Sequence, residues 1–277
     1  SSAASDVYKR QVYDEDWEPQ FMVYLDGKLI RGMDTKHRYV KLDSNRNGYD
    51  VHVYAYSQPS GKRTDFFAQL CQFNREVEKL YYNLKAPYRI LYYTDESTKE
   101  YADVREYLNT AINYINWCAP MSEEFLRSVD AANDYLMAEF YGKYCHDQDI
   151  KISVIGHTHI DVAWRWTLAQ TREKVQRTFG SVIEMMKKYP DYKFMSSQPQ
   201  LLKFLKEESP EMFDEVKKLV KEKRIELEGS MWLEADCNLT SGESLVRQII
   251  FGKRFFKDEF GVDNRICLLY TSDAADD

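Results

Sequence analysis

The sequence predicts an α/β protein in which an incomplete parallel β/α barrel follows a small β-rich module and a set of helices. After residue 150, apolar runs alternate regularly with amphipathic helical segments, as in parallel sheets and barrels. Before residue 95, short segments of alternating polarity are separated by turn signals, as in antiparallel sheets. We therefore expect a β-rich ancillary module at residues 12–94, a helical connector at 95–148 and the amino-terminal part of a truncated barrel domain at 149–266.

Residues 1–11 and 267–277 are interpreted as adapter-like artefacts. One codon choice for Val7–Gln11 has a reverse complement that, read one base in, encodes Cys-Leu-Leu-Tyr-Thr, the sequence of Cys267–Thr271. Two ends of one gene product rarely encode opposite strands of the same DNA, so both segments are excluded from the fold. The native segment is then expected to be cut at both ends.

Composition indicates a folded, mildly acidic protein. The 277 residues are 44% hydrophobic and 14% aromatic, and the net charge of −7 gives no reason to expect a nucleic-acid partner. No apolar run is long enough to cross a membrane. Cys71, Cys118, Cys145 and Cys237 lack a paired spacing, which favours free thiols and a cytoplasmic location.

Local signals place the elements of the first half. Asp26-Gly27 between two apolar runs predicts a hairpin, and alternating polarity over residues 51–56 predicts a half-buried strand. Pro59-Ser-Gly61 marks the next turn. Helical spacing runs from residue 101 to 115, and Ser122 opens a second helix that Gly142 could close.

The second half reads as three strand–helix pairs. Strands are expected at residues 151–156, 192–197 and 225–232, and helices at 168–188, 199–223 and 241–260. A further strand is expected to begin at Arg265-Ile266, where the second adapter-like segment follows. Three such pairs do not close a barrel, so we expect the domain to be interrupted.

Potential metal ligands follow the first and third of these strands. His157, His159 and Asp161 lie at alternate positions after the first strand, and Glu234 and Asp236 follow the third. Parallel strands direct their carboxyl ends to one edge of the sheet, so these side chains should converge. Nitrogen and oxygen donors suit zinc, and three protein ligands with an open position are typical of catalytic zinc.

Ordinary structural roles compete with this interpretation. A His-x-His at a strand end is as often coincidental or a buried, hydrogen-bonded pair as it is a metal site. The second acidic strand end shifts the balance toward a metal site. Core packing is also the commoner role for any one of Trp164, Trp166 and Trp232. Aromatic rings beside carboxylates would, however, suit a sugar.

Four segments together resemble glycoside hydrolase family 38, the class II α-mannosidases. They are His157–Trp164, Ser197–Gln200, Met231–Asn238 and Ser241–Gln248. The chain has Ile-Asp-Val-Ala-Trp where lysosomal and Golgi members typically carry Asn-Asp-Pro-Gly-Trp, which favours the cytosolic and bacterial branch. The β-rich module and helices upstream also resemble the amino-terminal region of that branch.

The resemblance implies a retaining α-mannosidase that acts on mannose-containing oligosaccharides with one Zn²⁺ or Co²⁺ per site. Asp236 would be the nucleophile and a metal ligand, and His159 and Asp161 would be the other ligands available here. Trp164 would stack on mannose, with His157 and Glu234 in supporting positions. The general acid/base and a further His ligand would come from later strands, so the chain as given is expected to be inactive.

Two alternatives stay open. One is another His-x-His-x-Asp metallo-hydrolase, although the β-lactamase type requires His where this chain has Val162, and the amidohydrolase type requires a later Lys or His. The other is a non-catalytic sugar-binding relative. The sequence does not fix the linkage preference, the metal, or whether the chain forms a homo-oligomer.

Overall fold

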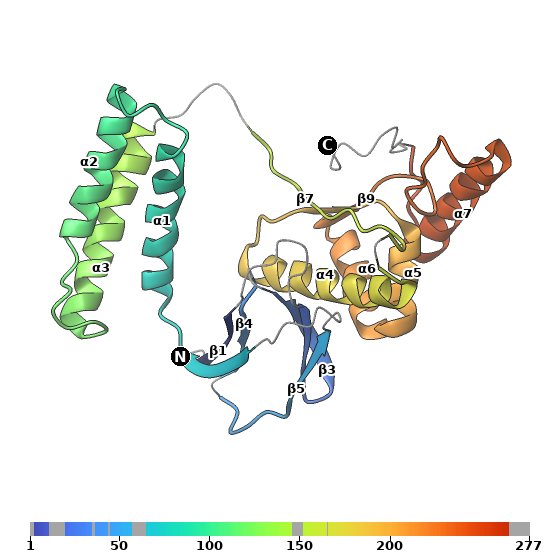
Figure 1. The fold of residues 1–277 in the computed structure, drawn as a ribbon, viewed down its shortest axis with the longest axis horizontal. Coiled ribbons are helices and arrows are strands. Elements are labelled where there is room, and N and C mark those ends of the chain that lie inside the picture. Colours follow the sequence, from blue (N-terminus) through green and yellow to red (C-terminus); the bar gives the residue numbers. More distant parts are fainter. Residues whose placement is uncertain are drawn as a thin grey trace. The chain divides into compact units, whose positions relative to one another are not determined.

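The computed structural model describes residues 3–10, 20–34, 37–43, 45–56, 65–145, 152–164 and 166–265 (Figure 1). They divide into two compact units, one formed mainly by residues 71–152 and the other by residues 5–70 together with those from 153 onward. Helices are mixed with three small sheets of three strands each. The expected mixture of helix and sheet is confirmed, whereas the barrel stays a prediction. Within the described ranges, no helix is long and apolar enough to cross a membrane.

The predicted hairpin is confirmed. Strands β2 (Gln20–Leu25) and β3 (Lys28–Met33) pair antiparallel, and β5 (Val51–Tyr56) pairs with the other edge of β2. Asp26 and Gly27 have φ angles of 52° and 80°. Two consecutive positive φ angles characterise the type I′ turn that the Asp-Gly pair favours. The turn predicted at residues 59–61 lies outside the described residues.

A second sheet has the order β4-β1-β6. Its strands are β4 (Tyr39–Lys41), β1 (Ala3–Arg10) and β6 (Asp65–Gln72). Strand β1 falls within the first adapter-like segment. That interpretation concerns the origin of the DNA rather than the conformation of the chain, and it stays a prediction.

The helical unit contains α1 (Arg75–Leu91), α2 (Lys99–Asn113), α3 (Glu123–Tyr135) and a π-helix, η1 (Leu136–Tyr144). Ser122 caps α3 as predicted, because its hydroxyl accepts a hydrogen bond from the N–H of Phe125 at 3.1 Å. The expected end at Gly142 was wrong, since this residue lies inside η1.

The sequence also missed helix α1, which precedes the first expected helix. Pro87 and several tyrosines give this segment a low helix propensity. Asn74 compensates locally, because its side chain accepts hydrogen bonds from the N–H groups of Glu76 and Val77. Leu80 is buried in the core of the unit, so tertiary packing outweighs intrinsic propensity here.

The β/α part contains a parallel sheet in the order β7-β8-β9. The strands are β7 (Gly156–His157), β8 (Phe194–Ser196) and β9 (Ile225–Leu227), and the helices are α4 (Leu168–Lys188), α5 (Pro199–Glu208), α6 (Pro210–Lys221) and α7 (Gly242–Phe260). All three strands are shorter than expected. Residues 152–155, expected to be in the first strand, are exposed and lie outside it.

The single helix expected at residues 199–223 is two helices. Ser209 has φ −144° and ψ 71°, which is not helical, and Pro210 starts the next helix. Proline disfavours the helical conformation of the residue before it and cannot donate a backbone hydrogen bond, so the break falls where the sequence places Pro210.

Helix α4 has the predicted bounds and forms the centre of its unit (Figure 1). Val175, Phe179, Val182 and Met186 are buried on its core side, as predicted. Strand β3 also packs against α4, where a Cβ placed on Gly32 would come within 2.5 Å of the Cβ of Arg177. The β-rich module and the β/α part therefore share this helix.

Candidate metal and sugar site

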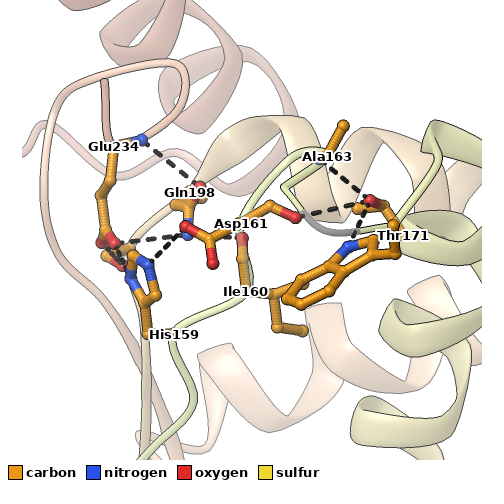
Figure 2. Close-up of polar contacts among 9 residues, drawn as sticks. His159, Ile160, Asp161, Ala163, Thr171, Gln198 and Glu234 are labelled. Atoms are coloured by element: carbon orange, nitrogen blue, oxygen red, sulfur yellow. Dashed lines mark hydrogen bonds and ion pairs between the residues drawn. The ribbon is translucent and has the colours of Figure 1, made fainter. Parts of the chain in front are cut away.

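The carboxyl ends of the three parallel strands lead into one cluster of polar side chains (Figure 2). His159 follows β7, Ser197 and Gln198 follow β8, and Glu234 lies in the segment after β9. The sequence-based expectation that side chains after the first and third strands converge is met by His159 and Glu234.

His159 lies between two carboxylates. Its Nδ1 is 2.5 Å from Oε2 of Glu234, and its Nε2 is 2.9 Å from Oδ1 of Asp161. The side chain of Glu234 is only 4% exposed, whereas those of His159 and Asp161 are 31% and 34% exposed. Glu234 thus contacts the imidazole from inside the protein, and Asp161 contacts it on the side that faces solvent.

The two carboxylates determine the charge preference of this histidine. Burial by itself lowers the pKa of His159, but the hydrogen bond to Asp161 and the attraction of Glu234 outweigh it, so the pKa is raised above its ordinary value. The cluster therefore favours a positive charge at the position of the ring. A cation held between His159 and Asp161 would meet the same electrostatic preference.

Gln198 forms hydrogen bonds to the segments that follow the other two strands. The sequence did not predict this role. Its side chain is almost fully buried, and its Nε2 donates to the carbonyl of Ile160 at 3.1 Å and to Oε2 of Glu234 at 3.4 Å. Its Oε1 accepts from the N–H of Glu234 at 3.3 Å. The other carboxylate oxygen of Glu234 accepts a hydrogen bond from the Ser197 hydroxyl. The sequence feature that could have indicated this role is the pair of polar residues, Ser197 and Gln198, directly after the second strand.

The tryptophan pair lies in the loop that follows Asp161. Trp164 is 50% exposed, and its ring meets that of Trp166 edge-on with centroids 5.6 Å apart. The indole N–H of Trp166 donates to the Thr171 hydroxyl at 3.1 Å. Trp164 is therefore the ring of this pair that presents more surface to a ligand.

Asp236 and His157 make hydrogen bonds to residues outside this cluster. Asp236 is exposed, and its Oδ1 accepts from the N–H of Asn238 at 2.8 Å, which closes a local turn. Nδ1 of His157 is 3.2 Å from the carbonyl of Met195, against the neighbouring strand. In the part of the chain that the structure describes, no three His, Cys, Asp or Glu side chains form a group that could hold a metal.

The donor set fits a divalent metal in part. Two ligand atoms of a tetrahedral zinc with bonds of 2.0–2.2 Å are roughly 3.3 Å apart, close to the 2.9 Å between His159 Nε2 and Asp161 Oδ1. A carboxylate on the opposite ring nitrogen, as Glu234 provides, is the usual outer partner of a metal-bound histidine. The third predicted ligand, Asp236, has its Oδ1 in the hydrogen bond to Asn238.

Part of the chain is similar to a known protein family. Residues 149–273 match the family model described as "Glycosyl hydrolases family 38 N-terminal domain". The matches support glycoside hydrolase family 38. All six predicted site residues lie inside the segment that matches this family.

Three similar proteins are named α-mannosidases. Alpha-mannosidase G of Dictyostelium discoideum is 33% identical over 264 residues, covering 87% of this chain and 24% of that protein. Alpha-mannosidase of Saccharomyces cerevisiae is 43% identical over 113 residues, covering 40% and 10%. Alpha-mannosidase 2C1 of Homo sapiens is 30% identical over 194 residues, covering 70% and 18%. The chain spans about a quarter or less of the length of these relatives.

Proposed function

We propose that this chain is the amino-terminal part of a retaining, metal-dependent α-mannosidase of glycoside hydrolase family 38. The observation that carries the proposal is His159, held between Asp161 and Glu234 at the carboxyl edge of three parallel strands. It lies in the segment that matches the family model, and the named relatives are α-mannosidases. The substrate class is a mannose-containing oligosaccharide.

His159, Asp161 and Asp236 would hold one Zn²⁺ or Co²⁺. A bound divalent cation would polarise the sugar hydroxyls that it contacts. Glu234 fixes the orientation of His159 through Nδ1, which leaves Nε2 directed at Asp161 and the metal position. Gln198 and Ser197 in turn keep the Glu234 carboxylate in place.

Asp236 would attack the anomeric carbon, and Trp164 would cover one face of the sugar ring. Retention requires a second carboxyl group about 5 Å from the nucleophile as general acid/base. We assign that group, and a further His ligand, to parts of the enzyme outside this chain. The sequence Ile-Asp-Val-Ala-Trp at residues 160–164 supports the cytosolic branch and a cytoplasmic location as part of the same proposal.

The test uses the full-length protein that carries this segment. Bound metal and hydrolysis of an aryl α-mannoside are measured for the wild type, for Asp236→Asn and for Asp258→Asn, an exposed aspartate on α7. We expect Asp236→Asn to lose roughly 10³-fold or more in kcat while keeping part of its metal, and Asp258→Asn to be unchanged. The first sugar product should have the α configuration.

Each other result has a distinct meaning. Full activity in Asp236→Asn would refute the nucleophile assignment. Metal and mannoside binding without turnover in the wild type would favour the non-catalytic sugar-binding relative. Turnover of an amide or a lactam in place of a mannoside would favour the other metallo-hydrolases.

A further inference from the structure

Thr171 lies in the first turn of helix α4, next to the loop that carries Asp161 and Ala163 (Figure 2). It is fully buried, with 0% of its surface exposed. Its hydroxyl accepts from the backbone N–H of Ala163 at 3.2 Å and from the indole N–H of Trp166 at 3.1 Å. It is also 3.4 Å from the carbonyl of Asp161 and 3.3 Å from that of Thr167.

These contacts use the whole hydrogen-bonding capacity of the side chain. A hydroxyl can accept two hydrogen bonds and donate one. Here Ala163 and Trp166 fill both acceptor positions, and one of the two carbonyls receives the proton. A buried hydroxyl without hydrogen-bond partners lowers the free energy of unfolding. The loop therefore stabilises Thr171 in its buried position, and Thr171 stabilises the conformation of the loop.

The loop needs such an anchor because its backbone is unfavourable. Ala163 has a φ of 67°, a left-handed conformation that residues with a Cβ rarely adopt. The hydrogen bond from its N–H to Thr171 joins this strained residue to α4. The helix is in turn fixed by Val175 and Phe179, both buried in the core. Asp161 and Trp164 lie on either side of the strained position.

We propose that Thr171 is a positioning residue whose buried hydroxyl fixes the loop, so that the Asp161 carboxylate faces His159 and the Trp164 ring stays at the edge of the site. This inference rests on the proposed function for what the loop does, and on the contacts of Thr171 alone for how the loop is held. It would act on metal affinity through Asp161 and on mannoside binding through Trp164.

The experiment compares three variants in the full-length protein. Thr171→Val keeps the shape of the side chain and removes the hydroxyl, whereas Thr171→Ser keeps the hydroxyl and removes the methyl group. Thr178→Val makes the same change farther along α4, at a half-buried position outside the loop contacts described above. Hydrogen exchange of the peptide covering residues 159–167, Zn²⁺ affinity by chelator competition, and kcat and KM for an aryl α-mannoside are measured for each.

We expect Thr171→Val to exchange faster in residues 159–167, to bind Zn²⁺ about tenfold more weakly and to raise KM more than it lowers kcat. Thr171→Ser should restore all three to within about twofold, and Thr178→Val should match the wild type. If Thr171→Val does not fold, the pair Thr171→Ala and Thr171→Ser makes the same comparison, because these variants differ only in the hydroxyl.

Unchanged exchange, Zn²⁺ affinity and KM in Thr171→Val would overturn the inference, as would equal losses in Thr171→Ser and Thr171→Val. Failure of the proposed function gives a different result. A wild type without metal binding or mannoside hydrolysis would refute the function, while hydrogen exchange alone would still decide whether Thr171 holds the loop.

Discussion

Replacing Glu234 with Gln should weaken metal binding without unfolding the protein. The carboxylate contacts His159 Nδ1 at 2.5 Å and also accepts from Ser197 and Gln198. In Glu234→Gln the amide oxygen can still accept from His159 and Gln198, and the amide N–H₂ can donate to the Ser197 hydroxyl, which then acts as acceptor. The substitution therefore removes the charge and preserves the shape and the hydrogen-bond network.

The size of the effect follows from that loss of charge. Hydrogen bonds to charged groups contribute about 1.5–3 kcal/mol, against about 0.5–1.5 kcal/mol for neutral ones. Solvent screens this contact little, because the Glu234 side chain is 4% exposed. A difference of about 1.4 kcal/mol corresponds to a tenfold change in affinity. Tenfold weaker metal binding also lies at the lower end of the range for outer partners of metal ligands.

The assay is competition for Zn²⁺ against a chromophoric chelator, with the full-length protein. Glu226→Gln is the matched control, because Glu226 is an exposed glutamate on β9. We expect the control to bind as the wild type does, and Glu234→Ala to lose more than Glu234→Gln. Wild-type affinity in Glu234→Gln, with its fold intact by circular dichroism, would refute the role of Glu234 as partner of a metal-bound His159.

Three further predictions concern the loop, the sugar and the core. Ala163→Gly should raise the free energy of unfolding by about 0.5–1 kcal/mol, because relief of the left-handed strain exceeds the added chain entropy. Ala131→Gly, at an exposed position in the middle of α3, should lower it by a similar amount in the same denaturant titration. Trp164→Ala should raise KM for an aryl mannoside roughly five- to tenfold, if the sugar covers on the order of 50 Å² of the indole, and an unchanged KM would exclude stacking. Leu202→Ala should cost about 2–5 kcal/mol, since Leu202 is fully buried, and a loss below 1 kcal/mol would contradict that packing.

Local chemistry made several elements of the fold predictable. Asp26-Gly27 determines its turn through backbone conformation alone, and the apolar spacing of α4 determines both its bounds and its buried face. Ser122 and Ser241 cap their helices with their own side chains. In each case the deciding interaction lies within a few residues of the signal, so one segment read by itself is sufficient.

Tertiary packing decided what the sequence did not predict. Helix α1 forms despite Pro87 because Leu80 is buried against the other helices of its unit. Trp232 is one of the three tryptophans considered above as rings that could contact a sugar. It donates its indole N–H to Gln200 at 2.7 Å and packs edge-on against Phe255. Its ring is half-buried and makes these two contacts, and periodicity cannot distinguish such a ring from one that faces a ligand.

The site was predictable only at the level of strand ends. Alternation after the first strand placed His159 and Asp161 together, and parallel topology brought Glu234 to them. The roles of Gln198 and Thr171 depend on hydrogen bonds to backbone groups of distant segments. No local sequence pattern predicts such a bond. A buried Gln or Thr looks the same in the sequence whether its hydrogen-bond partner lies in its own helix or in a distant loop.

The β-rich module also takes part in the support of this site, although the sequence sets it apart as ancillary. Gln20 of β2 accepts a hydrogen bond from Arg177, Tyr54 of β5 donates to Glu173 at 3.2 Å, and Lys188 donates to the hydroxyl of Tyr39 in β4 at 3.1 Å. All three partners lie on α4, the helix whose first turn holds the loop of Asp161 and Trp164. Because one face of α4 packs on the parallel sheet and another on this module, the helix has little freedom to shift. The module therefore stabilises the geometry of the site through a helix that it shares, without supplying any of the predicted site residues.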